Sequence, residues 1–395
     1  KEEFDHNKMR EAVAKSIKKL QQIKAKKAAF DFDVNADYGK SAAIGAMIAD
    51  YAYDKYKSEK AHHLDEITFA NFSQKDVEEG IVFGEAMKFT RDLANTPAQI
   101  ATPQKLAQIA SELEGVETKV FDKEEIQRMG MGAYLAVGQG SVNPPEFIHI
   151  KYTGKNVKKK IALIGKGICF DSGGLDIKPA SSMLTMKDDM SGAACILGVM
   201  RALAKLQPDV EVHGLIAACE NMPSGSSYKP GDILTAKNGK TIEVDNTDAE
   251  GRLTLADALC YACELNVDEV IDIATLTGAC VVALGSHISG IMGNDDNFIE
   301  SLIETGKDAG EKLWKLPMDR EYFDSLKSEI ADMKNTGSRM GGASAAGVFL
   351  QEFVEGPKWA HIDIAGTAYI EKPQKEFIAG ATGAGVRTLL SYVTK

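Results

Sequence analysis

The chain has 395 residues, which is long enough for two domains or for one large domain with a smaller appendage. Its 57 acidic residues outnumber its 46 basic residues, and the formal net charge of -11 argues against a nucleic acid or an anionic membrane as partner. No apolar run approaches the roughly 20 residues that a membrane-spanning helix requires, so we expect a soluble cytoplasmic protein.

The amino-terminal region is polar, with a Lys-rich amphipathic segment at 11–27 and an Ala-rich helical pattern at 41–56. A longer helical pattern covers 77–96 and ends before a proline, because proline cannot continue the hydrogen-bond ladder of a helix. We place a domain boundary just before this helix. The expected division is a small flanking α/β domain over 1–75 and a main domain over 76–395.

Apolar segments of β character alternate with helical patterns through the rest of the chain. We predict strands over 147–152, 159–165, 210–222, 269–279 and 359–366, and helices over 191–206, 253–265 and 345–354. This alternation predicts a mixed, largely parallel sheet with helices on both faces. Ligands of such sheets bind beyond the carboxyl ends of the strands, where the polar segments 167–179 and 246–253 are expected to lie.

The six cysteines lie mostly inside apolar segments, as buried thiols do in a reducing compartment. The CxxC pair, Cys260 and Cys263, falls in a helical pattern, and no second Cys or His pair follows it at the spacing of a zinc finger. We interpret this pair as core packing.

Two segments, 165–190 and 245–252, are dense in charged residues. They contain Lys166, Asp171, Lys178 and Asp189 in the first, and Asp248, Glu250 and Arg252 in the second. Taken alone, each acidic residue would suit a helix cap or a turn. If the two segments converge, their carboxylates would repel one another unless cations lie between them. Two divalent cations would balance four carboxylates, leaving Lys178 and Arg252 to stabilise a developing oxyanion, as metal-assisted hydrolysis requires.

The letters DSGG at 171–174 raise the alternative of a serine nucleophile at Ser172. A triad would recruit other residues from His361, His287, Asp363 and Asp272. However, Phe170 stands where the serine-protease fingerprint has glycine, and most of these partners fall in predicted strands. We interpret Ser172 as a turn residue. The chain also has no HExxH helix, the pattern of a mononuclear zinc protease.

The whole set, in order and spacing, resembles the cytosolic leucyl aminopeptidase family. The matching segments are GKGICFDSGGLDIKP, MKDDMSGAA, NTDAEGRL, ATLTGA and HIDIAG, and the resemblance covers about 77–395. It implies a dinuclear-metal exopeptidase that releases N-terminal residues, preferably leucine-like, from short peptides by attack of a metal-bridging hydroxide. It also implies a cytoplasmic homo-hexamer whose active sites face an interior cavity.

The resemblance assigns a metal-binding role to five residues. Asp171 and Glu250 would bridge the two ions, Lys166 and Asp189 would complete the tighter site, and Asp248 would complete the looser one. The ions are usually zinc, and manganese or magnesium can replace one of them. A lysine ligand must be neutral, so the pKa of Lys166 is expected to be lowered.

Further residues match the reaction and substrate positions of the family. Lys178 corresponds to the residue that stabilises the tetrahedral intermediate, and Arg252 to the one that holds a bicarbonate ion, proposed as the general base. Met186, Thr275 and Gly278 fall where the family lines its first side-chain pocket, an apolar slot suited to leucine-like residues.

The sequence differs from the family pattern at two places, and we consider three other functions for the chain. The segment before Lys187 lacks the commoner glycine, and the amino-terminal region is shorter than the usual domain, so we expect that domain to be partial or to lack segments. The alternatives are a narrower Cys-Gly or related dipeptidase, an inactive structural homologue, and a DNA-binding regulator. Every ligand position is filled, which disfavours the inactive homologue, and the net charge disfavours the regulator.

Overall fold

The computed structural model describes residues 4–32, 36–374 and 376–395. In this part of the chain an eight-stranded sheet has the order β11-β10-β13-β9-β5-β6-β4-β3. Its strands are β3 (Glu117–Phe121), β4 (Glu146–Thr153), β5 (Lys160–Asp171), β6 (Glu211–Asn221), β9 (Glu269–Ala274), β10 (Ser289–Gly293), β11 (Leu313–Lys315) and β13 (Lys358–Asp363). The central strands β6, β5, β9 and β13 are parallel, whereas β4 and β10 are antiparallel to their inner neighbours. The prediction of a mixed, largely parallel sheet is confirmed.

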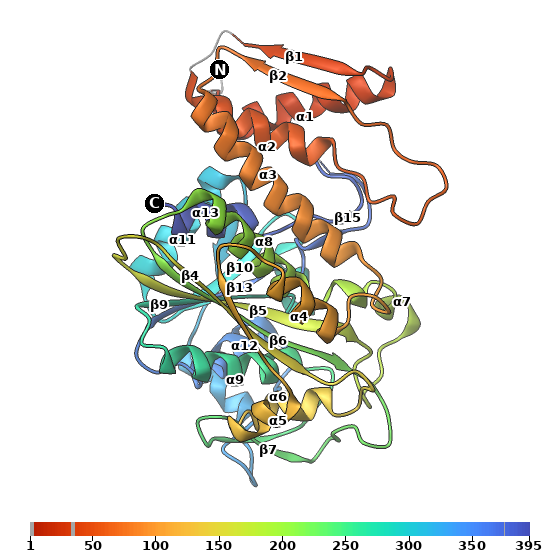
Figure 1. The fold of residues 1–395 in the computed structure, drawn as a ribbon. Helices are drawn as coiled ribbons and strands as arrows, with labels where there is room; N and C mark the ends of the chain where they lie inside the picture. Colours follow the sequence, from red (N-terminus) through yellow and green to blue (C-terminus); the bar gives the residue numbers. More distant parts are fainter. Residues whose placement is uncertain (1–3, 33–35, 375) are drawn as a thin grey trace.

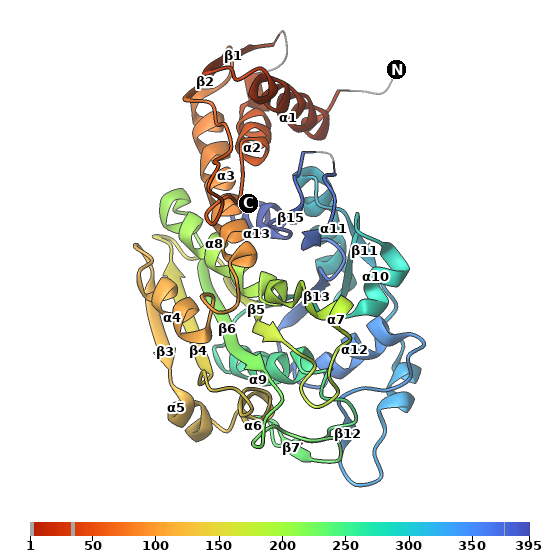
Figure 2. The ribbon, with the colours of Figure 1, turned by 90° about the vertical axis from the view of Figure 1, so that its right-hand side faces the viewer.

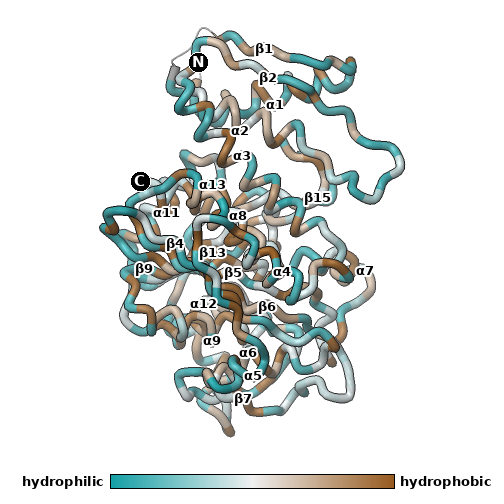
Figure 3. Tube along the Cα trace, in the orientation of Figure 1, coloured by the Kyte–Doolittle hydropathy of each residue, from teal (hydrophilic) through white to brown (hydrophobic). Residues whose placement is uncertain are grey.

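Helices cover both faces of this sheet (Figure 1). One face carries α8 (Ser191–Leu206), with α13 (Val386–Val393) and α11 (Asp296–Ala309) beside it. The other carries α9 (Gly251–Glu264), α6 (Gly132–Gly138) and α12 (Gly342–Gln351). Two hydrophobic cores result, one on each side of the sheet, and the apolar residues concentrate along its central strands (Figure 3).

The first turn of α8 lies unusually close to the sheet, at Gly192. A Cβ atom at this position would stand 2.2 Å from the carbonyl oxygen of Ile273 in β9 and 2.8 Å from the backbone nitrogen of Lys166 in β5. Only glycine permits this approach. The contact fixes the segment just before α8 against the end of the sheet, and this segment contains Asp189.

The amino-terminal residues form a smaller α/β unit. Here α1 (His6–Gln22) and α2 (Gly39–Ala49) pack against each other, beside the parallel pair β1 (Lys27–Asp31) and β2 (Glu66–Ala70). The helix predicted over 41–56 is α2, which begins at Gly39 and ends at Ala49, earlier than predicted. The long α3 (Gln74–Asn95) packs against both α2 and α8, so it links this unit to the main sheet (Figure 2).

Two predicted strand ends are corrected by the structure. We expected the strand at 159–165 to give way to a loop, but β5 continues to Asp171 because it pairs with β6 along this whole length, with a register shift between Ile168 and Phe170. Lys166 consequently lies inside a strand. The strand predicted over 269–279 ends at Ala274, and α10 (Gly278–Leu284) begins shortly after it. Across the described ranges, no helix combines the length and apolar character needed to cross a membrane.

Candidate active site

The charged residues singled out in the sequence meet at the carboxyl ends of the central strands. Lys166 and Asp171 belong to β5, and Asp189 lies just before α8. Asp248 and Glu250 lie on the turn before α9, with Glu250 at the cap of that helix. Because parallel strands end at the same edge of a sheet, residues distant in sequence reach one point.

Carboxylates dominate the centre of this cluster. One oxygen each from Asp171, Asp248 and Glu250 lies within 4.8 Å of the others. Lys166 Nζ is 2.7 Å from Asp189 Oδ2 and 2.9 Å from Glu250 Oε1. All of these side chains are buried except that of Asp248, which is partly exposed.

A second lysine approaches the cluster from the other side. Lys178 Nζ lies 2.8 Å from Asp171 Oδ2 and 2.5 Å from Asp248 Oδ1. Burial opposes its charge, but Asp171 and Glu250 outweigh that effect and raise the pKa of Lys178. Lys178 therefore carries a positive charge next to the carboxylates at neutral pH.

The lowered pKa expected for Lys166 is not found with these neighbours. Burial alone would lower it, but the adjacent carboxylates of Asp189, Glu250 and Asp171 raise the pKa of Lys166. Burial also raises the pKa of Asp189 and of Glu250, since each charge is removed from water beside another carboxylate. A lowered Lys166 pKa requires cations that offset the carboxylate charge, so it is an expectation for the metal-loaded site only.

The donor atoms of the cluster fit divalent cations. Glu250 Oε2 is buried, and within residues 4–32, 36–374 and 376–395 it has no hydrogen-bond partner. Buried carboxylate oxygens left in this way are costly unless a cation or donor satisfies them. A set of several carboxylates with one amine suits hard or borderline divalent ions.

Asn221, at the carboxyl end of β6, supports the cluster but was missed in the sequence. Its Nδ2 donates to Asp171 Oδ1 at 2.8 Å and to the carbonyl oxygen of Thr247 at 3.0 Å, which ties β5 to the turn before α9. A polar residue that ends a buried strand was the available signal. Thr275 also reaches the cluster, since its Oγ1 donates to Asp189 Oδ1 at 2.7 Å and its carbonyl oxygen accepts from Lys166 Nζ at 2.9 Å.

Ser172 is a buried turn residue, as predicted. Its Oγ donates to the carbonyl oxygen of Asn221 at 2.6 Å and accepts from the backbone N–H of Gly174. The proposed triad partner His361 is buried in β13, where its Nδ1 pairs with Asp272 Oδ1 at 2.5 Å. These residues are structural partners within the sheet.

The remaining site candidates differ in how they relate to the cluster. Arg252 lies in the first turn of α9, and burial lowers its pKa to about 10, so it stays charged at neutral pH. Met186 is partly buried and begins the short helical turn that leads to Asp189. Gly278 is exposed at the start of α10. No hydrogen bond of the described residues links Met186 or Gly278 to the cluster, so their place in a substrate pocket stays a prediction.

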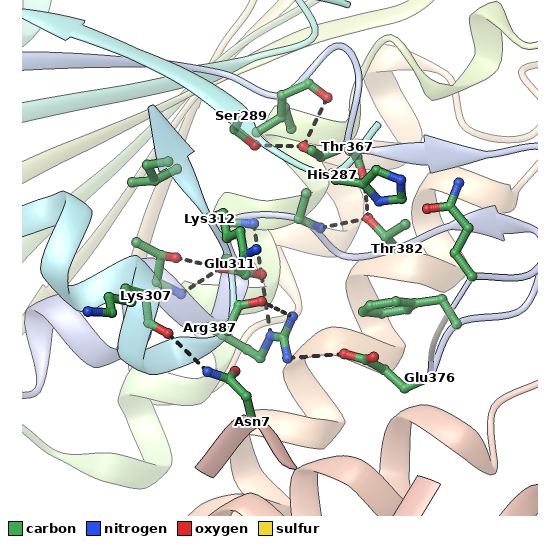
Figure 4. A pocket seen from close by; sticks show the side chains of 18 of the residues that line it. Asn7, His287, Ser289, Lys307, Glu311, Lys312, Thr367, Glu376, Thr382 and Arg387 are labelled. Atoms are coloured by element: carbon green, nitrogen blue, oxygen red, sulfur yellow. Dashed lines mark hydrogen bonds and ion pairs between the residues drawn. The ribbon is translucent and has the colours of Figure 1, made fainter. Parts of the chain in front are cut away.

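A separate cavity of about 870 Å³ lies between α1 and the carboxyl-terminal segment. In its wall Arg387 forms ion pairs with Glu311 and Glu376, and the three side chains converge (Figure 4). None of the cluster residues lines this cavity. We therefore locate the chemistry at the carboxylate cluster and not in this cavity.

Comparison with known proteins agrees with the geometry of the cluster. The catalytic-domain model of the cytosol aminopeptidase family matches residues 88–390, and the N-terminal-domain model of that family matches residues 1–60. A probable cytosol aminopeptidase of Aquifex aeolicus is 48% identical, covering 100% of this chain and 83% of that protein. Another, from Persephonella marina, is 52% identical over 88% of this chain and 73% of that protein.

A solved structure shares the fold over nearly the whole chain. The bottromycin maturation enzyme BotP in complex with Mn superposes with a TM-score of 0.94 at 35% identity, covering 98% of this chain and 87% of that one. The fold and the carboxylate cluster define a metal-dependent hydrolase of peptides. The chain belongs to the cytosol aminopeptidase family, whose members use two divalent metal ions to remove residues from the amino termini of peptides. The resemblance inferred from the sequence is confirmed.

Proposed function

We propose that this aminopeptidase prefers leucine-like residues at the amino terminus of short peptides. The observation that carries the peptidase activity is the meeting of four carboxylates with Lys166 and Lys178 at one edge of the sheet. Thr275, which hydrogen-bonds to Asp189, would form the first side-chain pocket with Met186 and Gly278.

The metal ions would be held by the residues that meet in the cluster. Asp171, Glu250, Lys166, Asp189 and Asp248 would together hold the two ions. Zinc would be the usual ion, with manganese or magnesium able to occupy one site. When bound, two divalent cations supply the Lewis acid that polarises the scissile carbonyl and activates water as the attacking hydroxide.

Two cationic side chains would take part in the reaction without binding the metal ions. The Lys178 ammonium, already next to Asp171 and Asp248, would donate to the oxygen on which negative charge develops. Arg252 would hold a bicarbonate ion that accepts a proton as general base. Its guanidinium suits this role because its Nε is buried without a hydrogen-bond partner among the described residues.

We also propose where the enzyme acts, its oligomeric state and its division into domains. It would act in the cytoplasm as a homo-hexamer, with neither nucleic acid nor membrane as partner. The net charge of -11 supports the exclusion of nucleic acid. We divide the chain into a partial N-terminal domain over 1–75 and a catalytic domain over 76–395, with α3 packed against both.

A substrate panel tests the proposed preference. Aminoacyl fluorogenic substrates, with cysteinylglycine as a dipeptide, are assayed with zinc, manganese or magnesium. We expect the highest kcat/KM for the leucyl substrate and essentially none for its N-acetylated form, because the acetylated nitrogen is no longer an amine. Preference for cysteinylglycine would show that the enzyme is a dipeptidase and not a leucyl aminopeptidase. Cleavage of the N-acetylated substrate would show that it is not an exopeptidase that requires a free amino terminus.

A further inference from the structure

Asn335 contacts the turn that carries two of the proposed metal ligands. It follows β12 (Met333–Lys334) and is fully buried. Its Oδ1 accepts from the backbone nitrogens of Asp245 at 2.8 Å and Asn246 at 3.3 Å. Its Nδ2 donates to the carbonyl oxygens of Asn246 at 2.7 Å and Ala249 at 3.3 Å. One side chain thus makes four hydrogen bonds to the residues on either side of Asp248.

The backbone of Asn335 makes two further contacts. Its carbonyl oxygen accepts from Arg252 Nη1 at 2.9 Å, and its N–H donates to the carbonyl oxygen of Glu243 at 2.9 Å. Glu243 ends β8 (Thr241–Glu243), the strand that leads into the turn. Asn335 is therefore bonded to the beginning of the turn, to its middle and, through Arg252, to the helix that follows it.

We propose that Asn335 is a positioning residue, which holds the turn of Asp248 and Glu250 and the guanidinium of Arg252 in one fixed arrangement. This inference rests on the roles proposed above for those three residues. The turn lies between β8 and α9, so strand and helix hydrogen bonds do not hold its middle. The side-chain amide of Asn335 supplies donors and acceptors at the points where the turn lacks them.

The chain offers a control for the loss of such contacts. Asn294 also bonds to backbone groups through its side-chain amide, at the start of β13: its Nδ2 donates to the carbonyl oxygen of Pro357 at 3.1 Å and its Oδ1 accepts from the backbone nitrogen of Trp359 at 2.7 Å. Asn294 has no part in the proposed catalytic or binding machinery. Asn294→Ala therefore reports what the loss of side-chain amide bonds to the backbone does away from the cluster.

The test measures Mn²⁺ affinity and steady-state kinetics on the full chain. Protein stripped of metal is titrated with Mn²⁺ by calorimetry, and kcat and KM for an aminoacyl substrate are measured at saturating Mn²⁺. We expect Asn335→Ala to bind Mn²⁺ roughly 10–100-fold more weakly and to lower kcat more than it changes KM, the scale typical of residues that orient metal ligands. Asn294→Ala should match the wild type in both measurements.

A second variant guards against a folding defect. Asn335→Asp keeps the shape and the Oδ1 acceptor but lacks the two amide N–H donors, so it should also weaken Mn²⁺ binding. If either folded Asn335 variant binds Mn²⁺ and turns over like the wild type, or if Asn294→Ala shows equal losses, the positioning role is wrong. A wild-type protein that binds Mn²⁺ yet cleaves no aminoacyl substrate would refute the proposed function, whereas the affinities would still decide the role of Asn335.

Discussion

Lys166 Nζ lies 2.9 Å from Glu250 Oε1, so a residue inside strand β5 is joined directly to the cap of helix α9. Both side chains are buried. The contact depends on the residue after Glu250, since a Cβ atom at Gly251 would stand 2.4 Å from Lys166 Cε. The Lys166 side chain can lie here because residue 251 has no Cβ atom.

Gly251→Ala should displace the Lys166 side chain and lower activity at least about tenfold, because loss of geometry at a catalytic site is costly. The clash involves the far end of a flexible side chain, so the fold should survive. Activity and thermal unfolding are measured together. Gly225→Ala is the control, since an added Cβ there meets nothing within 4 Å. Wild-type activity in Gly251→Ala would contradict the placement of Lys166.

Substitution of Lys166 and substitution of Lys178 should have different effects on metal content and turnover. Lys166→Ala removes a proposed ligand, so metal content should fall and added metal should restore part of the activity. Lys178→Ala should retain both ions yet lower kcat roughly a hundredfold or more, as expected when one oxyanion donor is removed. Metal content by mass spectrometry, measured beside turnover at saturating metal, distinguishes the two. Loss of metal in Lys178→Ala together with full loading of Lys166→Ala would reverse the roles.

Ser172→Ala should keep most of the activity, because the hydroxyl bonds to the backbone of Asn221, at the end of β6, and of Gly174, and not to a proposed metal ligand. The lost hydrogen bond should cost about 1 kcal/mol of unfolding free energy. Asp248→Asn and Glu250→Gln should instead lose several orders of magnitude in kcat/KM, since they alter proposed ligands. A serine-directed fluorophosphonate provides an independent check: stoichiometric labelling of Ser172 would establish the serine mechanism instead.

The alternation of strand and helix could be read from the sequence because apolar periodicity differs between these elements. The end of β5 could not, because Lys166 and Asp171 are charged residues in a buried strand. They are tolerated there only because Asp189, Glu250 and Lys178 arrive from other segments to pair with them. Such compensation is tertiary and leaves no local pattern.

The candidate site, too, could be predicted only where its residues form a local pattern in the sequence. The residues of the NTDAEGRL and GKGICFDSGG segments could be named from spacing, and the structure brings them together. Asn335 could not, because it lies in an irregular segment, and its bonds reach Asn246 and Ala249, nearly ninety residues earlier in the chain. Only the folded chain shows that Asn335 joins the turn, through its side-chain amide, to Arg252, through its backbone carbonyl oxygen.

Asp257, on α9, should make stability depend on pH. Burial raises its pKa from 3.8 to about 7, although the backbone N–H groups of Tyr134 and Lys237 donate to it. The folded state then holds this proton more tightly than the unfolded state, so the contribution is present below pH 4 and is lost as pH rises towards 7. The loss amounts to roughly 4 kcal/mol.

Denaturant unfolding of wild type and Asp257→Asn between pH 4 and pH 8 checks this sign. The variant cannot titrate at this position, so the stability advantage of the wild type over it should shrink as pH rises. A difference that is constant or grows with pH would show that the folded-state pKa of Asp257 is not raised.

If hydrolysis depends on cations held by the carboxylate cluster, removal of metal should abolish it. After prolonged chelation and verified loss of metal, we expect no measurable aminopeptidase activity. Titration with zinc or manganese should restore activity with an endpoint near two ions per chain, and Glu250→Gln should not regain it. Full activity in protein shown to be free of metal would mean that hydrolysis does not depend on cations at the cluster.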